Sequence, residues 1–123
     1  MIGYVTLGTN DLARAAKFYD ALLATLDAKR TWESDRYVGW GTDASAPMLL
    51  VIKPHDGRPA SVGNGSMVSL VARSRAEADA VYAKALALGA RDEGPVGPRG
   101  DDFYAGYFRD LDGNKLAVYF VPV

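Results

Sequence analysis

The chain of 123 residues contains no cysteine and a single histidine, His55. The lack of cysteine excludes disulfides, a thiol nucleophile and thiolate metal sites, and one imidazole excludes any site that needs two from one chain. The sequence also lacks an apolar run long enough to span a bilayer, and no basic-then-apolar signal opens it. We therefore expect a cytoplasmic protein that has no membrane partner.

An excess of charge of one sign is also missing. Fourteen basic residues stand against fifteen acidic ones, which leaves a net charge of −1 and a pI near 5.7. This balance gives no field that would steer the chain onto nucleic acid. Hydrophobic residues make up 49% and charged residues 24% of the chain, as in a folded protein, and the length suits a single domain over residues 1–123.

An internal repeat is the first positive feature of the sequence. When the chain is shifted by 63 residues, residues 4–24 align with residues 67–87, and seven of these 21 positions are identical. Both copies consist of a short β-like run, a polar break and an amphipathic helix. The first helix is expected to begin after Thr9 and Asn10, either of which can cap it, and the second after Ser74, with Gly89 at its end.

Three β-like runs follow each predicted helix. The expected runs are residues 28–33, 36–42 and 47–53 after the first helix, and 91–94, 103–109 and 115–121 after the second. Residues 53–59, 63–65 and 94–100 are expected to be loops, and residues 110–114 a tight turn. The order of strand, helix and three strands, given twice, predicts an α+β fold with mixed sheets, in a first module of about residues 1–55 and a second of about 64–123.

Strand alternation divides the predicted strands into a helix side and an opposite side, which becomes concave if the sheets curl. Val5 and Leu7 are expected to form the floor beneath the first helix. In the closing hairpin, a register that pairs Arg109 with Lys115 brings Tyr107 to the concave side, whereas the other register brings Tyr104 and Phe108 there. The first-strand residues expected on the concave side of the two modules are Tyr4, Thr6, Met67 and Ser69.

Several aromatic side chains are candidates for a wall against a planar ligand, or alternatively for packing against the other module or subunit. Arg99, in a Gly- and Pro-rich loop, suits an anionic ligand if the loop closes over the site, or is an exposed loop arginine. His55 is either a catalytic base or an exposed loop histidine. The aromatic wall and its Met neighbour would comprise Tyr4, Trp40, Met67, Tyr104, Tyr107 and Tyr119.

Two motifs resemble the vicinal oxygen chelate superfamily, which includes glyoxalases, extradiol dioxygenases and bleomycin-binding proteins. Residues 9–19, TNDLARAAKFY, resemble its first-helix signature, and residues 108–116, FRDLDGNKL, resemble its closing hairpin. The resemblance covers nearly the whole chain. It implies two tandem βαβββ modules whose curved mixed sheets form a groove, and a homodimer.

The resemblance also implies where a divalent metal would be held. The family's ligand positions fall on Tyr4, Met67 and Ala117, with a fourth in the strand around residues 49–51. No carboxylate or imidazole stands at any of them, and Met and Ala are poor or impossible ligands for a hard or borderline ion. We therefore expect no metal and no cofactor.

These observations predict a metal-free protein that binds an aromatic or amphiphilic small molecule in an aromatic groove and sequesters it. The alternatives are a glyoxalase-like lyase or isomerase, metal-independent through Tyr4, Tyr107 or His55 or with an atypical metal site, and a degenerate domain kept for protein association. The predicted ligand-binding residues are Tyr4, Thr6, Trp40, Met67, Ser69, Arg99, Tyr104, Tyr107, Ala117 and Tyr119.

Overall fold

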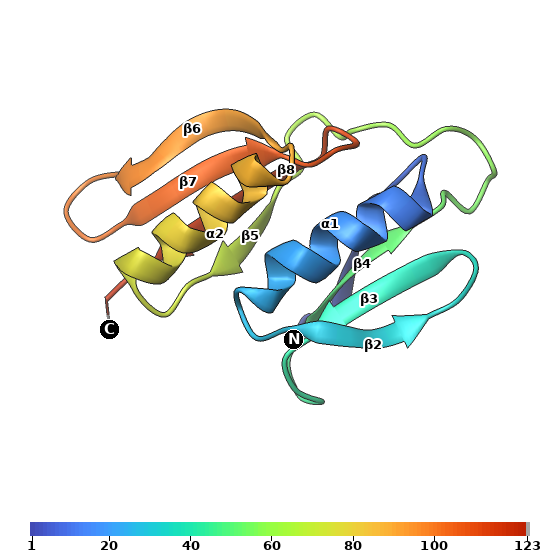
Figure 1. The fold of residues 1–123 in the computed structure, drawn as a ribbon, viewed down its shortest axis with the longest axis horizontal. Coiled ribbons are helices and arrows are strands. Elements are labelled where there is room, and N and C mark those ends of the chain that lie inside the picture. The colour runs from blue at the N-terminus through green and yellow to red at the C-terminus, as the bar shows by residue number, and fades with distance from the viewer. Residues whose placement is uncertain (123) are drawn as a thin grey trace. The chain divides into compact units, whose positions relative to one another are not determined.

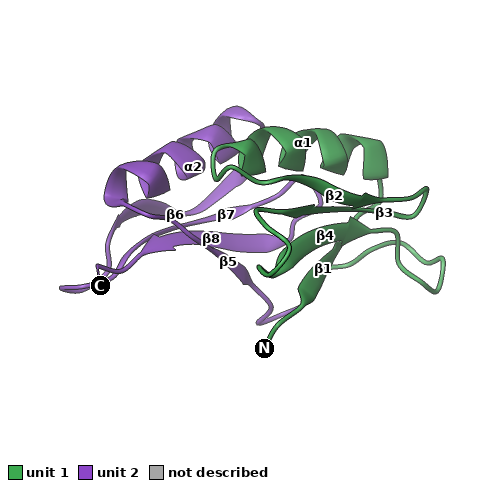
Figure 2. Ribbon diagram, turned by 90° about the horizontal axis from the view of Figure 1, so that it is seen from below, with its two compact units in different colours: residues 1–62 green, residues 63–123 purple. Residues whose placement is uncertain are grey.

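The computed structural model describes residues 1–122 and divides into two compact units that join between Val62 and Gly63 (Figures 1 and 2). Each unit is a four-stranded sheet with one helix on one of its faces. The join lies between the two modules expected from the sequence, which end near residue 55 and begin near residue 64.

In unit 1 a parallel strand pair is followed by antiparallel strands. The strand order is β1-β4-β3-β2, with β1 parallel to β4 and the other pairs antiparallel. The helix connects the edge strands β1 and β2. The elements are β1 (Tyr4–Gly8), α1 (Leu12–Ala24), β2 (Lys29–Glu33), β3 (Tyr37–Gly41) and β4 (Met48–Ile52).

Unit 2 repeats this plan. Its strand order is β5-β8-β7-β6, again with one parallel pair, β5 and β8, and antiparallel pairs elsewhere. The predicted α+β fold of two tandem βαβββ modules is therefore confirmed. The elements are β5 (Val68–Val71), α2 (Arg75–Ala87), β6 (Arg91–Pro98), β7 (Tyr104–Arg109) and β8 (Lys115–Phe120).

The helix caps agree with the sequence in unit 2 and differ from it in unit 1. Ser74 caps α2 as predicted, since its hydroxyl accepts a hydrogen bond from the backbone N–H of Glu77. Asp11, and not Thr9 or Asn10, caps α1: its backbone is extended, and its carboxylate accepts from the N–H of the third helical residue. The Asn10 side chain instead binds the backbone of a residue far along the chain, Ala60.

Each helix buries one stripe against its sheet. In α1 the stripe includes large side chains, among them Phe18, Tyr19 and Leu22. In α2 the buried residues are smaller, namely Ala78, Val81 and Ala85. The sheet of unit 2 packs larger side chains against this helix, among them Phe108 and Leu116.

The expected loop over residues 94–100 is wrong for most of its length, because β6 continues to Pro98. Two register shifts, on either side of Gly94, interrupt its pairing with β7. Since β6 is an edge strand, prolines that lack an N–H can be accommodated, and bulges absorb the irregular backbone. Gly94 has a φ of 156°, within the range that favours glycine.

Candidate functional site

The face of each sheet that is turned away from its own helix, here called the far face, carries the candidate site. The opposite face, which packs against the helix, is called the helix face. In unit 1 it is identified by Trp40, whose ring centroid lies 5.6 Å from that of Tyr19 on α1. Alternation and the observed registers then assign every strand residue to a face. The far face of unit 1 consists of Tyr4, Thr6, Gly8, Lys29, Thr31, Trp32, Tyr37, Gly39, Gly41, Met48, Leu50 and Ile52.

Tyr4 and Trp32 form the aromatic part of this far face. They come from opposite edges of the sheet, yet their ring centroids lie 5.4 Å apart in an edge-to-face arrangement. Neighbouring strands are spaced by about 4.8 Å. Side chains on the two outer strands of four therefore meet because the sheet curves toward the far face. Tyr4 remains 53% and Trp32 43% exposed, so both rings offer apolar surface to a ligand.

The floor between these two rings is made by Leu50. β3 contributes a glycine there, Gly39, and a Cβ on it would lie 2.9 Å from Leu50 Cδ1. The leucine side chain thus lies over the bare backbone of the neighbouring strand. Thr6, which pairs with Leu50, supplies a hydroxyl beside this floor. The far face of unit 1 is mostly apolar, and among its strand residues Lys29, which pairs with Gly41, carries a charge.

Two predicted ligand residues lie on the helix faces. Trp40 is 1% exposed, and its indole N–H donates to the carboxylate of Asp20 on α1 at 2.9 Å. Tyr104 donates its hydroxyl to Asp79 on α2. Both rings are therefore part of the packing between a sheet and its helix, and we leave them out of the candidate site.

Trp32 takes the place that the sequence gave to Trp40, and alternation missed it for a physical reason. The register shifts between Arg30, which pairs with Trp40, and Trp32, which pairs with Gly39. Such a β-bulge adds one residue to a strand and moves the following side chains to the other face. No simple pattern in the sequence marks this position.

In unit 2 the closing hairpin has the first of the two registers considered. Arg109 pairs with Lys115 and Tyr107 pairs with Ala117. Ala117 also pairs with Ser69, so these three residues form a row across β5, β8 and β7. Tyr104, three positions before Tyr107 in β7, contacts Asp79 and Arg75 on the α2 side. Because three is an odd number of strand positions, Tyr107 and its row lie on the far face.

The Tyr107 ring is flanked by two cations. Arg99 Cζ lies 5.6 Å and Lys115 Nζ 5.5 Å from the ring centroid. Gly94 lies opposite in the ladder, and a Cβ there would be 3.2 Å from the ring. Arg99 follows β6 directly and folds back along its own strand end.

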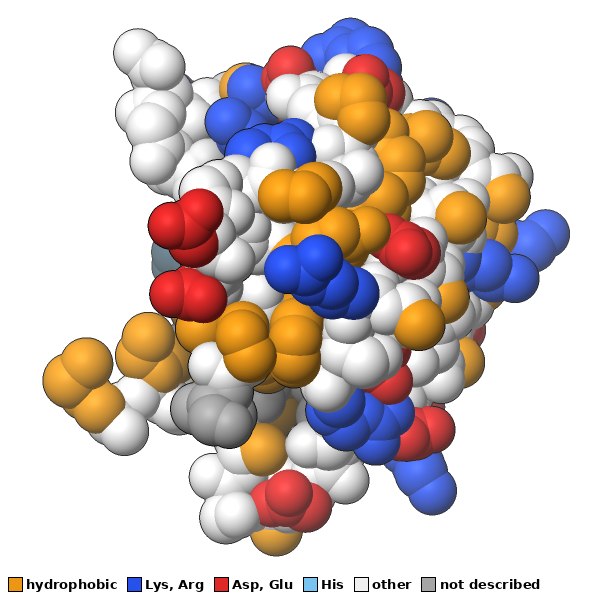
Figure 3. All heavy atoms as spheres, turned by 90° about the vertical axis from the view of Figure 1, so that its left-hand side faces the viewer, with side chains coloured by type: hydrophobic (Ala, Val, Ile, Leu, Met, Phe, Trp, Pro, Cys, Tyr) orange, Lys and Arg blue, Asp and Glu red, His pale blue; other side chains and the backbone are white. Residues whose placement is uncertain are grey.

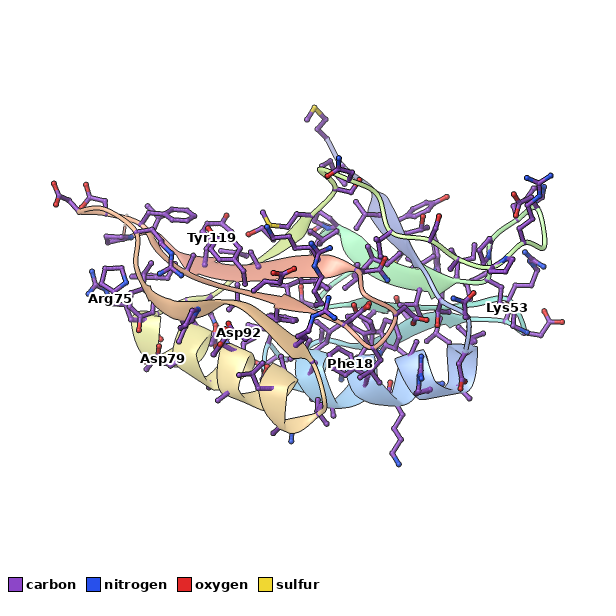
Figure 4. All side chains as sticks on the ribbon, turned by 90° about the horizontal axis from the view of Figure 1, so that it is seen from above. Phe18, Lys53, Arg75, Asp79, Asp92 and Tyr119 are labelled. Atoms are coloured by element: carbon purple, nitrogen blue, oxygen red, sulfur yellow. The ribbon has the colours of Figure 1, made fainter. Side chains whose placement is uncertain are left out.

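Phe103 and Tyr119 add a second aromatic contact to unit 2. Their rings are stacked, with centroids 5.6 Å apart and planes inclined by 15°. Figure 4 shows Tyr119 on the side of the sheet away from α2, while Asp79 lies on α2 itself. The sequence reasoning included Tyr119 and missed Phe103, which lies in the loop just before β7.

Most of the predicted ligand residues thus lie on the far faces, and whether a ligand contacts them stays a prediction. Met67 directly precedes β5 and is 45% exposed, whereas Ala117 is buried. His55 is exposed in a turn after β4, in which the N–H of Gly57 donates to the carbonyl of Pro54. The residues on the far faces are Tyr4, Thr6, Met67, Ser69, Tyr107, Ala117 and Tyr119.

The positions that the family resemblance assigns to metal ligands carry a phenol, a thioether, a methyl group and an isobutyl group. Of residues 49–51 in β4, Leu50 faces the far side, whereas Leu49 and Val51 point to the helix. Among residues 1–122, no three His, Asp or Glu side chains gather in a way that could hold a metal ion. This donor set does not fit a hard or borderline divalent cation.

Charge is distributed without a dominant sign over the side of the molecule shown in Figure 3, where basic and acidic side chains alternate with hydrophobic ones. In the part of the chain that the structure describes, neither helix is long and apolar enough to cross a membrane.

Known proteins share both the sequence pattern and the fold. The sequence model of the Glyoxalase/Bleomycin resistance protein/Dioxygenase superfamily matches residues 1–118. A glyoxalase/bleomycin resistance protein from Albidiferax ferrireducens T118 is 36% identical over 99% of both chains, with a TM-score of 0.91. No protein of curated function matches the chain at a significant level.

More distant structures share the fold. A lactoylglutathione lyase from Agrobacterium tumefaciens is 22% identical over 98% of this chain and 92% of its own, with a TM-score of 0.71. A family enzyme from Burkholderia phytofirmans PsJN is 14% identical over 98% of both chains, with a TM-score of 0.78. The family match and the Albidiferax structure confirm the resemblance seen in the sequence: the chain belongs to the Glyoxalase/Bleomycin resistance protein/Dioxygenase superfamily.

Proposed function

We propose that this protein binds an aromatic or amphiphilic small molecule without a metal ion, and that it acts by sequestering that molecule. The observation that carries the proposal is the far face of unit 1, where Tyr4 and Trp32 present two exposed rings above Leu50. The positions at which a metal would be expected offer no suitable donor set, and this supports binding in place of metal-assisted chemistry.

The energetic basis of such binding is the burial of apolar surface. Each Å² of apolar surface that a ligand removes from contact with water contributes about 25 cal/mol of favourable binding free energy. An aromatic side chain offers a large surface and few rotamers, so ordering it on binding costs little. The Tyr4 and Trp32 rings already contact each other, which holds them in place before a ligand arrives.

A fluorescence titration tests the proposal. The probe is N-phenyl-1-naphthylamine, which is uncharged and aromatic, added to protein dialysed against EDTA with its metal content measured by mass spectrometry. We expect saturable binding that does not change when nickel or zinc is added. Trp32→Ala should weaken it by about tenfold, the loss of one aromatic contact, with little change in melting temperature.

Val62→Ala is the matched control, because it removes an exposed apolar side chain outside the sheets. This variant should bind the probe as the wild type does. Binding that requires added metal, or turnover of methylglyoxal with glutathione that follows added metal, would contradict the proposal and favour the lyase alternative.

A further inference from the structure

The far face of unit 2 has an excess of positive charge. Arg91, Arg109 and Lys115 form one row across β6, β7 and β8, because each pairs with the next. Arg99 lies beside the neighbouring row, next to the same Tyr107 ring that Lys115 approaches. Against these four cations stands one carboxylate in contact with them, that of Glu93.

The Glu93 carboxylate is already paired with one of these cations. It forms an ion pair with Arg109, whose hydrogen bond holds the pKa of Glu93 below its usual value, and the charges of Arg91 and Lys115 act in the same direction. In residues 1–122, neither Arg99 nor Lys115 forms an ion pair with a carboxylate. Among residues 1–122, Arg109 thus has an ion pair with Glu93, and the other three cations, Arg91 included, have none.

Arg99 is held in place by neutral groups. Its Nη2 donates to the carbonyl of Pro95 at 2.6 Å, and its Nη1 donates to those of Gly97 and Pro98 at 3.1 and 3.3 Å. Carbonyl oxygens fix the guanidinium without cancelling its charge, so an incoming anion would not have to order this side chain. The acidic residues of the same loop, Asp101 and Asp102, are exposed.

We propose that Arg99 and Lys115, which both lie beside the Tyr107 ring on the far face of unit 2, bind the oxyanion group of a small molecule. The chemical class is an aromatic or amphiphilic compound that carries a carboxylate, phosphate or sulfonate. The guanidinium and the ammonium group each lie within 5.6 Å of the ring centroid, so an oxyanion beside this ring is offered charge-assisted contacts by neighbouring cations. This inference rests on the proposed function and adds the charge of the ligand to it.

The test uses a pair of probes that differ by one anionic group. 8-Anilinonaphthalene-1-sulfonate is N-phenyl-1-naphthylamine with a sulfonate added. The wild type should bind the sulfonate more tightly than the neutral probe, and 0.5 M NaCl should reduce this preference, because salt screens charge–charge attraction. Arg99→Gln and Lys115→Met should each weaken sulfonate binding by about tenfold and leave binding of the neutral probe unchanged.

Matched controls remove the same charges elsewhere. Arg58→Gln lies in an exposed loop of unit 1, and Lys84→Met lies exposed on α2, away from the far face. Both should keep the preference for the sulfonate. Unchanged binding of the neutral probe shows that a variant is folded, and Lys115→Met tests the site even if Arg99→Gln disturbs its loop.

A sulfonate preference that persists in both Arg99→Gln and Lys115→Met would overturn the inference. A second measurement separates this failure from failure of the proposed function. Benzoate or phenyl phosphate, but not benzamide, should shift the side-chain NMR signals of Arg99 and Lys115, whether or not the neutral probe binds. A larger shift with benzoate identifies a carboxylate as the preferred group, and a larger shift with phenyl phosphate identifies a phosphate; no shift with either contradicts the site.

Discussion

The two units share one plan and differ in what their far faces present. At corresponding places in the ladders, unit 1 has Leu50 beside Gly39, and unit 2 has Ala117 beside Tyr107. The far face of unit 1 is mostly aromatic and apolar, with Lys29 at its β2 edge, whereas that of unit 2 has several cations beside one aromatic ring.

The internal repeat follows the same division. Its identical strand positions, Val5 with Val68 and Leu7 with Leu70, lie on the helix faces. On the far faces the repeat places Met67 where unit 1 has Tyr4. A helix face must fit the stripe of its helix in both units, which restricts its side chains to apolar ones. A far face has no such partner within its unit, so its chemistry can differ.

The largest expected effect is a loss of stability when the helix face of unit 1 is altered. Trp40→Ala removes a fully buried ring, its contact with Tyr19 and its hydrogen bond to Asp20, and should lower the free energy of unfolding by about 3–5 kcal/mol. Trp32→Ala, on the far face, should cost less than about 1 kcal/mol, because that ring is substantially exposed. Urea unfolding followed by circular dichroism measures both, and equal losses would contradict the assignment of the two faces.

The second effect concerns the helix face of unit 2, where Gly106 occupies the position that Val38 has in unit 1. A Cβ on Gly106 would lie 3.0 Å from the Cα of Val96 and from Cδ1 of Tyr82. Since the backbone atom cannot rotate away, Gly106→Ala should destabilise the protein by about 1–3 kcal/mol. Gly3→Ala is the control, because nothing lies within 4 Å of its Cβ; a similar loss there would refute the explanation.

The smallest effect is a difference in pH dependence between the units. In unit 2, burial and the hydrogen bond to Asp92 raise the pKa of Tyr82 to about 12. A tyrosine in the unfolded chain has a pKa of about 10. The neutral phenol thus contributes stability that is complete below pH 10 and is lost as the pH rises toward 12. Tyr82→Phe should show a smaller alkaline fall in melting temperature than the wild type.

Unit 1 should respond at the opposite end of the pH scale. Hydrogen bonds from Arg30 and then Trp40 lower the pKa of Asp20 below its usual value. The charged carboxylate therefore contributes stability that is present above the pKa of the unfolded chain and is lost as the pH falls through the folded-state value. Asp20→Asn should reduce the fall of the melting temperature at acid pH and leave its fall at alkaline pH unchanged. The reverse result would contradict this assignment.

Sequence reasoning predicted the element order because it depends on local patterns. The apolar stripes of both helices, the Ser74 cap, the Gly89 terminus and the turn over residues 110–114 all depend on neighbours within a few residues. One error was local, since Asp11 caps α1 in place of Thr9 or Asn10. The other errors occurred where two distant strands decide the geometry. β6 continues past Gly94 because β7 pairs with it, and the bulge before Trp32 is defined only against β3.

The sequence by itself determined the repeat, the fold and the chemistry of the positions where relatives would hold a metal, since these follow from periodicity and from which side chains are present. The tertiary structure decided which rings face the helices and which face away. A strand's two faces look alike in sequence until pairing fixes the register: β3 directs Trp40 to the helix, and a bulge in β2 turns Trp32 to the far face.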